Sequence, residues 1–431
     1  MNPPLVGFAG MTHLGLVSAT AIAAKGLPTR CYDPDQALVE RLREGEWPVH
    51  EPDLVPLRQR NGDRQQFSAD LRALRECDLV YVSPDVPTDA HGNSDLAGIL
   101  ALTNEVASVL KDDAVMVVLS QVPPGFSRAL TAVPHQRLYY QVETLVFGCA
   151  VERAMKPERF VVGCADPQVR LDPRFAVVLS TFGCPILTMR YESAELAKIA
   201  INCCLAASIG VANTLSEICE RVGADWSEIV PALRLDRRIG PHAYLAPGLG
   251  IAGGNLERDL ATVIGLSARY GTDGEIVHAC LGNSRHRGQW ATRTLREVLL
   301  ARSPAAKVAV WGLAYKENTH STKNSPALAV LAQLPNTCFM LHDPVVPASA
   351  LTDAHAVSAG DPVAMLAGAD ALMILTAWPQ YRAIAPENIA RAMRGRIVLD
   401  PYRVLDRTRA IEAGLDYYTL GAPAHPLGER Q

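Results

Sequence analysis

The chain has 431 residues, of which 48% are hydrophobic and 20% charged, and its formal net charge is −4. This length suffices for two or three domains with separate cores. The small negative charge argues against nucleic-acid or membrane-surface binding, and no apolar run reaches the ~18 residues of a membrane span. The N-terminus lacks the basic segment of a signal peptide. The ten cysteines show no CxxC spacing, so we expect reduced, mostly buried thiols, no metal and a cytoplasmic location.

The N-terminal third follows the pattern of a dinucleotide-binding domain. A short apolar strand at 5–9 leads into a turn from Gly10 to Gly15, a helical run and a second strand at 29–32 that ends at Asp33. In this pattern a pyrophosphate lies at the helix N-terminus, and the acid holds the ribose hydroxyls, which favours NAD over NADP. Thr12 stands where a second glycine normally lets the backbone approach the pyrophosphate. Its hydroxyl could donate to a phosphate instead.

Two further strands, at 79–83 and 115–120, are each followed by a proline-rich turn, at 84–89 and 121–125. Alternation of strands and helices predicts a parallel sheet, and ligands bind at the C-terminal edge of such sheets. Proline-rich turns can simply end strands. Two of them at equivalent places indicate one wall of a cofactor site.

A long helix is predicted at 192–222, with Ser193 as its N-cap and Gly223 beyond its end. Its middle is apolar or small nearly all the way round, so we expect burial on most faces. Lys198 and Asn202 lie one turn apart on this helix. Taken alone, the helix favours a lysine that reaches outwards beside a hydrogen-bonded asparagine, because a buried pair needs polar partners.

The rest of the chain predicts more helices and then a second α/β unit. We expect helices at 225–235 and within 262–300, strands at 308–311, 338–342, 371–375 and 397–399, and a helix at 326–333.

The successive motifs resemble those of the UDP-glucose/GDP-mannose dehydrogenase family along essentially the whole chain. They include GxxxxGLVSA at 10–19, YDPD at 32–35, EPDL at 51–54, VPTD at 86–89, VPPG at 122–125, AELAKIAIN at 194–202, RIGP at 238–241, WGLAYKENT at 311–319 and HDPVV at 342–346. No single motif is specific, but their order and spacing are. The resemblance implies an α/β fold with two doubly wound Rossmann-like domains joined by the long helix and a helical dimerisation region. The implied parts are an NAD-binding domain at 1–190, a helical centre that forms a homodimer at 191–300, and a domain for the nucleotide sugar at 301–431.

Family members oxidise C6 of a nucleotide-linked sugar twice, from alcohol to aldehyde to acid, with two NAD. The resemblance implies that Lys198, Asn202 and Asp259 handle the reacting oxygen, since a lysine ammonium stabilises a developing alkoxide. Glu143 and Asn255 complete the implied catalytic set. The implied cofactor-binding residues are Gly10, Thr12, His13, Leu14, Gly15, Asp33, Pro87, Thr88, Ser120 and Gln121. The implied substrate-binding residues are Thr144, Leu145, Arg238, Tyr244, Gly250, Lys316 and Lys323. Arg238 would reach the partner's sugar site, or would otherwise be a solvated loop charge.

Three departures from the family concern the second oxidation. The thiol nucleophile is missing, because Asn255 occupies its place in one alignment of the glycine-rich segment and nothing does in the other. A threonine that handles water is Gln121, and a second glutamate is Phe147. An amide cannot replace a thiolate. Lys323 also replaces an arginine and cannot form a bidentate fork.

We therefore expect an NAD-dependent oxidoreductase that acts on a nucleotide-activated sugar, a UDP-sugar, by one two-electron step or by redox-neutral epimerisation. One alternative is a dehydrogenase that forms a sugar acid through an aldehyde hydrate. Another is a non-catalytic paralogue that binds nucleotide sugars.

Overall fold

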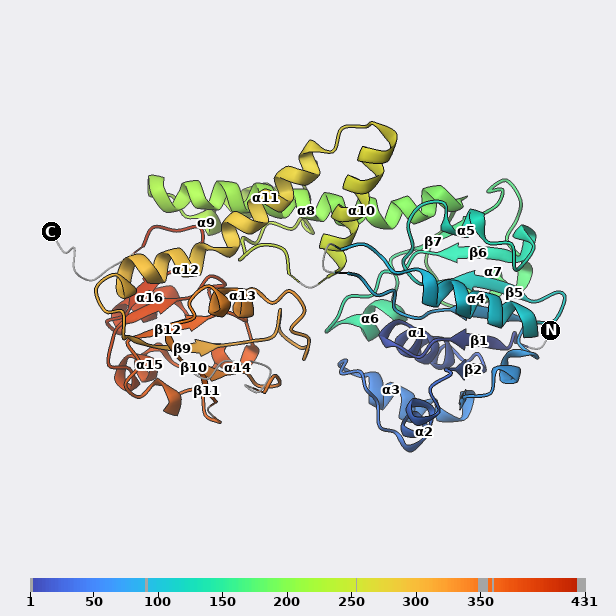
Figure 1. The fold of residues 1–431 in the computed structure, drawn as a ribbon, viewed down its shortest axis with the longest axis horizontal. Helices are drawn as coiled ribbons and strands as arrows, with labels where there is room; N and C mark the ends of the chain where they lie inside the picture. Colours follow the sequence, from blue (N-terminus) through green and yellow to red (C-terminus); the bar gives the residue numbers. More distant parts are fainter. Residues whose placement is uncertain (1–2, 90–91, 253, 348–355, 359, 425–431) are drawn as a thin grey trace. The chain divides into compact units, whose positions relative to one another are not determined.

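The computed structural model describes residues 3–89, 92–252, 254–347, 356–358 and 360–424. The chain divides into two compact units, Met1–Ile201 and Asn202–Gln431. The division falls inside the long helix α8 (Tyr191–Val222), drawn in green in Figure 1.

The first unit is built on an eight-stranded sheet with the order β3-β2-β1-β4-β5-β6-β7-β8. Its strands are β1 (Val6–Ala9), β2 (Thr29–Tyr32), β3 (Gln65–Ser68), β4 (Leu79–Val82), β5 (Val115–Val118), β6 (Leu138–Gln141), β7 (Phe160–Cys164) and β8 (Ile186–Arg190). All neighbouring strands are parallel except β6 and β7, which are antiparallel. The parallel sheet predicted from the sequence is thus confirmed, and β3 and β6 to β8 extend it beyond the strands that were predicted.

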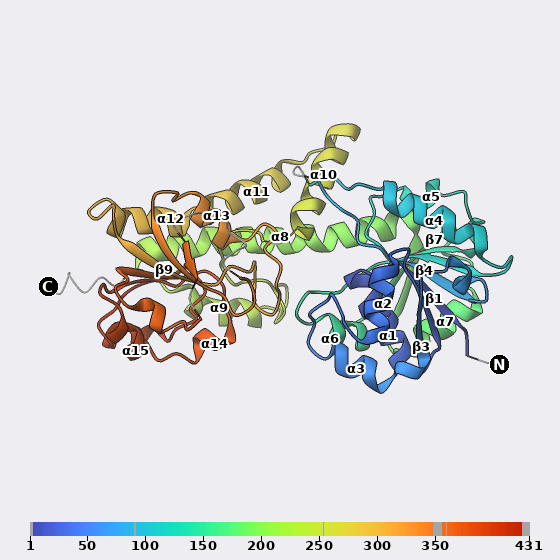
Figure 2. The same ribbon diagram turned by 60° about the horizontal axis from the view of Figure 1, so that its bottom comes forward.

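Helices cover both faces of this sheet. They are α1 (His13–Ala24), α2 (Gln36–Glu44), α3 (Leu54–Arg60), α4 (Ala97–Val109), α5 (Phe126–Ala129), α6 (Ala150–Met155) and α7 (Pro173–Ser180). Apolar residues of α1, α2 and α7 share one core with Val6, Phe8 and Tyr81 of the strands. Residues of α4 and the start of α8 pack in a second core with Val80 and Val82. Neighbouring strand residues therefore face opposite cores, as the pleat requires. Figure 2 shows α1 beside α3 and α6.

The second unit contains a six-stranded, fully parallel sheet with the order β11-β10-β9-β12-β13-β14. Its strands are β9 (Lys307–Trp311), β10 (Cys338–His342), β11 (Ala356–Ser358), β12 (Ala371–Ile374), β13 (Ile397–Leu399) and β14 (Asp416–Tyr418). Its helices besides α8 are α9 (Trp226–Leu235), α10 (Asn255–Tyr270), α11 (Glu275–Gly288), α12 (Trp290–Leu295), α13 (Pro326–Ala332), α14 (Pro379–Arg382), α15 (Pro386–Ala392) and α16 (Arg407–Glu412). The expected second α/β unit is confirmed.

The long helix differs from its prediction in two respects. It begins at Tyr191, directly after β8, so Ser193 lies inside it and is not its N-cap. Its middle is also less buried than predicted: Ala200, Cys204 and Val211 are exposed to solvent in the single chain. The predicted end is confirmed, since Gly223 follows Val222 with a φ of 82°. Within the described residues α8 is the one helix long and apolar enough for a membrane span, a test that core helices also pass.

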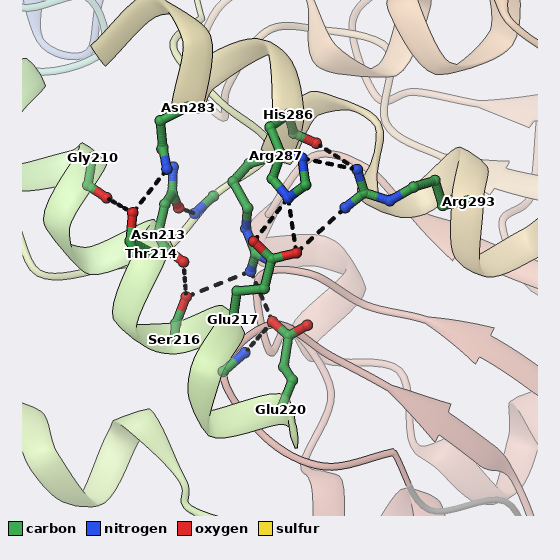
Figure 3. A network of polar contacts seen from close by, with 12 residues as sticks. Gly210, Asn213, Thr214, Ser216, Glu217, Glu220, Asn283, His286, Arg287 and Arg293 are labelled. Atoms are coloured by element: carbon green, nitrogen blue, oxygen red, sulfur yellow. Dashed lines mark hydrogen bonds and ion pairs between the residues drawn. The ribbon is translucent and has the colours of Figure 1, made fainter. Parts of the chain in front are cut away.

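Ion pairs fix α8 to α11 within the second unit (Figure 3). Arg287 is fully buried and lies 2.8 Å from Glu220 and 3.5 Å from Glu217. His286 binds Glu217 at 2.9 Å, and Arg293 approaches the same carboxylate. A buried arginine needs such partners because an unpaired charge is costly in the interior. The network thus aligns α8 with the helix that follows α10, and α10 carries Asp259.

Candidate active site

At each end of the turn between β1 and α1, only a glycine fits. Gly10 has a φ of 94°, and a Cβ there would lie 2.7 Å from the backbone nitrogen of Pro84. A Cβ on Gly15 would lie 2.0 Å from the carbonyl oxygen of Gly10. Both contacts are far too short, so the two glycines permit the close packing of strand and helix that the dinucleotide turn requires.

The N-terminus of α1 has no capping side chain. Thr12 occupies the N-cap position without a side-chain cap hydrogen bond, and the first turn contains no acid. By contrast, α2 is capped by Asp35, which accepts a hydrogen bond from the Leu38 N–H. The first amides of α1 are therefore suited to an anion such as a pyrophosphate.

The Thr12 hydroxyl makes two hydrogen bonds to the segment that follows β4. It donates to the Ser83 carbonyl at 3.3 Å and accepts from the Asp85 N–H at 3.0 Å. Both partners follow β4, so the hydroxyl ties the turn to the proline-rich loop.

Asp33 is buried at the end of β2 beside the same turn. One carboxylate oxygen accepts the Met11 N–H at 2.7 Å, and the other accepts the Asp35 N–H at 3.0 Å. These bonds hold the carboxylate where the fingerprint places a ribose-binding acid.

The remaining predicted cofactor residues are distributed over three segments. His13 begins α1 and Leu14 is buried behind it. Pro87 and Thr88 lie in the loop after β4, where Thr88 pairs with Ser94 in an isolated bridge. Ser120 and Gln121 follow β5 and are buried, and the Ser120 hydroxyl donates to the Pro84 carbonyl at 2.5 Å. The two proline-rich turns are thus joined at one edge of the sheet.

Lys198 faces a carboxylate within the first unit. Its Nζ lies 3.6 Å from Oε2 of Glu143, and both side chains are at least 85% buried. Glu143 also accepts the Leu145 N–H, and the Thr144 carbonyl accepts Arg153 Nε at 2.7 Å. The lysine is therefore buried together with a counter-charge, and the alternative of an outward-reaching side chain is wrong.

The segment that carries Glu143 borders a cavity of about 50 Å³ in the first unit. Glu143, Thr144 and Leu145 line one part of it, and Leu14 and Ser18 of α1 line another.

Asn202 and Asp259 meet within the second unit. The Asn202 amide donates to Oδ2 of Asp259 at 2.5 Å, and both residues are buried. Arg258 Nε lies 3.4 Å from Oδ1 of the same carboxylate. Asp259 is the fifth residue of α10, which begins at Asn255.

Lys323 lies against the segment before α10. A Cβ on Gly254 would meet Lys323 Cε at 2.9 Å, and the neighbouring Asn324 donates to Glu257. The cation is therefore close to the backbone that leads into Asn255. This contact brings two predicted site residues together from segments almost 70 residues apart.

The other predicted substrate residues are not gathered in this way. Arg238 pairs with Asp236 at 2.7 Å and has a side chain 89% exposed, so in the single chain it is a solvated loop charge. Tyr244 is half exposed. Gly250 has a φ of 90° and packs on the Ser284 carbonyl, which explains the glycine without a ligand. Lys316 lies 5.6 Å from the centre of the Tyr315 ring.

The cysteines are less buried than predicted. Cys31, Cys77, Cys164 and Cys219 are buried, whereas Cys204 and Cys338 are exposed and the rest are intermediate. Burial, with a smaller effect of the nearby Asp259 charge, raises the pKa of Cys203 to about 11. Burial likewise raises the pKa of Cys280. Both thiols are protonated near neutral pH and are poor nucleophiles.

Two residues of this region were missed from the sequence. Arg258 was overlooked although it directly precedes Asp259. Glu51 was noted only as part of the EPDL motif, yet its buried carboxylate contacts His13. The sequence does indicate Glu51, because an acid inside a dinucleotide-binding domain needs a polar partner if it is buried.

The fold and the site together define a class of protein. A dinucleotide turn with an uncapped helix and a ribose-type acid, beside a buried lysine–glutamate pair, is the arrangement of an NAD-dependent dehydrogenase. The comparisons with known proteins give the family. Sequence models of the UDP-glucose/GDP-mannose dehydrogenase family match the chain at residues 5–178 (NAD binding domain), 192–283 (central domain) and 309–407 (UDP binding domain). The chain belongs to this family of NAD-dependent nucleotide-sugar oxidoreductases.

Individual relatives agree over nearly the full length. The chain is 29% identical to a UDP-glucose 6-dehydrogenase of Pseudomonas aeruginosa, with 96% of each chain covered. It is 28% identical to UDP-glucose 6-dehydrogenase TuaD of Bacillus subtilis, with 96% of this chain and 92% of the relative covered. Among solved structures, a UDP-glucose dehydrogenase from Pyrobaculum islandicum is similar with a TM-score of 0.86 and 28% identity, and 98% of each chain is covered.

Proposed function

We propose that this chain oxidises a nucleotide-activated sugar, a UDP-sugar, by a single two-electron step and releases the carbonyl product. A UDP binding domain in the C-terminal part and relatives named UDP-glucose 6-dehydrogenases support this substrate class. The observation that carries the single step is the amide of Asn255 at the start of α10, close before the buried Asp259.

The proposed first oxidation uses residues that the chain retains in each of its two units. NAD, when bound, accepts the hydride. Lys198 supplies a buried positive charge for the developing alkoxide, and Glu143 keeps that charge in place at 3.6 Å. Asp259 acts as the base, directly or through water, and the Asn202 amide orients its carboxylate through the 2.5 Å hydrogen bond.

The proposal excludes the second oxidation because the family's thiol nucleophile and second glutamate are replaced in this chain. A thioester forms from a thiolate. Cys203 is near Asp259, but its pKa is raised to about 11, mainly by burial, so it is a protonated thiol near neutral pH. At the place of the second glutamate, the Phe147 ring packs on His13 with centroids 4.1 Å apart. A phenyl ring activates no water, so the aldehyde has no evident route to the acid.

The stoichiometry of NADH decides this proposal. Purified protein is incubated with NAD and UDP-, GDP- and dTDP-sugars, NADH is followed by absorbance, and the product is identified by mass. We expect one NADH per sugar consumed and a product two hydrogens lighter than the substrate. Two NADH and a sugar acid would overturn the proposal in favour of oxidation through a hydrate.

Two further outcomes of this experiment would indicate other functions. A sugar changed in configuration without net NADH would indicate epimerisation, in which the oxidised intermediate is reduced again. Binding of the sugar with no change in it would indicate a non-catalytic paralogue. Either result contradicts a net two-electron oxidation.

The proposal also gives each of the three parts of the chain a role. We assign NAD binding to 1–190, dimerisation to the helical centre at 191–300 and nucleotide-sugar binding to 301–431, where Lys316 and Lys323 would meet the substrate. In a homodimer the exposed Arg238 would find its place at the partner's sugar site. Cytoplasmic location is part of this proposal, because nucleotide sugars and NAD are cytoplasmic metabolites.

A further inference from the structure

Glu51 is a buried carboxylate that joins three segments of the first unit. Its side chain is fully buried and lies 2.8 Å from Nε2 of His13, the first residue of α1. The same carboxylate accepts the Gly148 N–H at 2.9 Å and the Ala150 N–H at 3.2 Å. Glu51 itself lies in the loop before α3. One acid therefore connects the cofactor helix with the segment that follows Glu143.

The His13 ring is held on a second side as well. Phe147 packs on it with ring centroids 4.1 Å apart and an angle of 31° between the planes. The ring is thus clamped between an aromatic face and a carboxylate, and its side chain is only 11% exposed. Because the bond to Glu51 uses Nε2, Nδ1 is the ring nitrogen that can meet a ligand.

The His13 ring lies at the N-terminus of α1, where the pyrophosphate of NAD is expected to bind. His13 starts a helix whose first turn has no capping side chain and no acid. These features fit the pyrophosphate of NAD. Because the Nε2–H donates to the Glu51 carboxylate, Nδ1 adds a donor at that helix end when the ring carries both protons. The segment from Phe147 to Ala150 continues directly from the loop of Glu143, which faces Lys198.

We propose that Glu51 is a positioning residue of the NAD site. Its carboxylate fixes the His13 imidazole at the N-terminus of α1 for contact with the cofactor pyrophosphate, and it also holds the backbone at Gly148 and Ala150. Cofactor binding at α1 thereby orders the segment that follows Glu143. This inference depends on NAD binding and is independent of whether oxidation stops after two electrons.

Burial and hydrogen bonding agree with a permanently charged Glu51. Burial by itself raises the pKa of Glu51, but hydrogen bonds from His13, Gly148 and Ala150 outweigh it and lower the pKa below its usual value. The acid is therefore a carboxylate near neutral pH, as a partner for the His13 ring.

Binding of NAD, measured by calorimetry on the full chain, tests the proposal without any assay of turnover. Glu51→Gln keeps the size of the side chain and removes its charge, and His13→Phe keeps the packing on Phe147 and removes both ring nitrogens. We expect each variant to weaken NAD binding about tenfold, and the double variant to lose no more than either single one. Glu46→Gln, an exposed glutamate of the same loop, should bind NAD like the wild type.

A second readout separates positioning from general damage. Amide hydrogen exchange at Gly148 and Ala150 should slow on addition of NAD in the wild type, and His13→Phe should remove most of that slowing. Wild-type NAD affinity in His13→Phe, or additive losses in the double variant, would overturn the proposal. Should Glu51→Gln fail to fold, the affinity and the exchange of His13→Phe, which retains Glu51, still decide it.

Discussion

Glu51 and Glu195 are both buried carboxylates of the first unit, yet their pKa values move in opposite directions. Burial, with a smaller effect of the nearby Glu192 charge, raises the pKa of Glu195, and the bonds from Gly125 and Ser127 do not compensate. At Glu51 the imidazole and two amides outweigh burial and lower the pKa. Both side chains are withdrawn from water, so the difference lies in their hydrogen bonds and in the neighbouring charge, His13 beside Glu51 and Glu192 beside Glu195.

These directions predict opposite pH dependence of stability. A lowered folded pKa means that Glu51 stabilises the fold above its unfolded pKa and that this contribution is lost as pH falls through the folded pKa. The raised folded pKa of Glu195 has the reverse effect, so its contribution is present below the unfolded pKa and is lost as pH rises. Urea unfolding from about pH 3 to 8 should show Glu51→Gln becoming less stable relative to the wild type as pH rises from about 3 to 5, the range at and below the unfolded pKa. Glu195→Gln should become relatively more stable, and parallel curves would contradict the assignment.

Lys198 should matter for rate more than for folding. Removing a preorganised charge beside a developing oxyanion typically costs about 10²–10³ in rate, so we expect Lys198→Ala to lose that much activity with the sugar that the protein oxidises. Lys111→Ala is the matched control, because Lys111 also pairs with a carboxylate of this unit, Asp78 at 2.6 Å. It should retain activity within about twofold. Equal losses in both variants would remove Lys198 from the chemistry.

At the scale of elements, the junction of β1 and α1 depends on close backbone packing. Gly15→Ala would place a Cβ 2.0 Å from the Gly10 carbonyl oxygen. The backbone would have to shift, which we expect to cost about 1–3 kcal/mol of stability and most of the NAD affinity. Thermal unfolding and NAD titration measure the two effects.

The control is a glycine of another helix in the same unit. Gly98 lies in α4, and a Cβ there would meet nothing within 4 Å. Gly98→Ala should stabilise the protein by about 0.5–1 kcal/mol and leave NAD binding unchanged. If Gly15→Ala behaved like Gly98→Ala, the tight turn would not govern cofactor binding.

At the scale of the whole molecule, the same turn is built in both units. Gly10 and Gly312 each follow the first strand of a sheet with a φ above 90°, and each donates to the carbonyl that precedes an acid, Asp33 or Asp343. In both units the next N–H donates to that acid at 2.7 Å. Asp343 additionally accepts a hydrogen bond from Trp378 Nε1. Asp343 thus bonds a side chain as well as backbone amides, whereas the hydrogen bonds that Asp33 accepts from Met11 and Asp35 both come from backbone amides.

The exposed face of α8 predicts a dimer. Val211, Leu215, Ile218 and Val222 recur at helical spacing, and each is at least 42% exposed in the single chain. A continuous apolar stripe of this kind marks an association surface. We expect sedimentation at micromolar concentration to show a dimer and Ile218→Glu to shift it to monomer. Val169→Glu, at an exposed valine before α7, should remain dimeric, and a wild-type monomer would contradict the prediction.

Local patterns in the sequence sufficed for most elements and for naming candidate residues of the site. The turn from Gly10 to Gly15, the acid at Asp33 and the one-turn spacing of Lys198 and Asn202 follow from periodicity and short motifs. Such features depend on neighbours in the chain, so they are readable without a fold.

Only the tertiary structure decided the contacts that join distant segments. Glu51 meets His13 across 38 residues and Gly148 across 97, and the Thr12 hydroxyl turns to residues beyond β4. The exposed stripe on α8, where burial was expected, likewise depends on which elements pack against the helix. Composition measures how apolar a helix is, but the arrangement of the other elements determines which of its faces they cover.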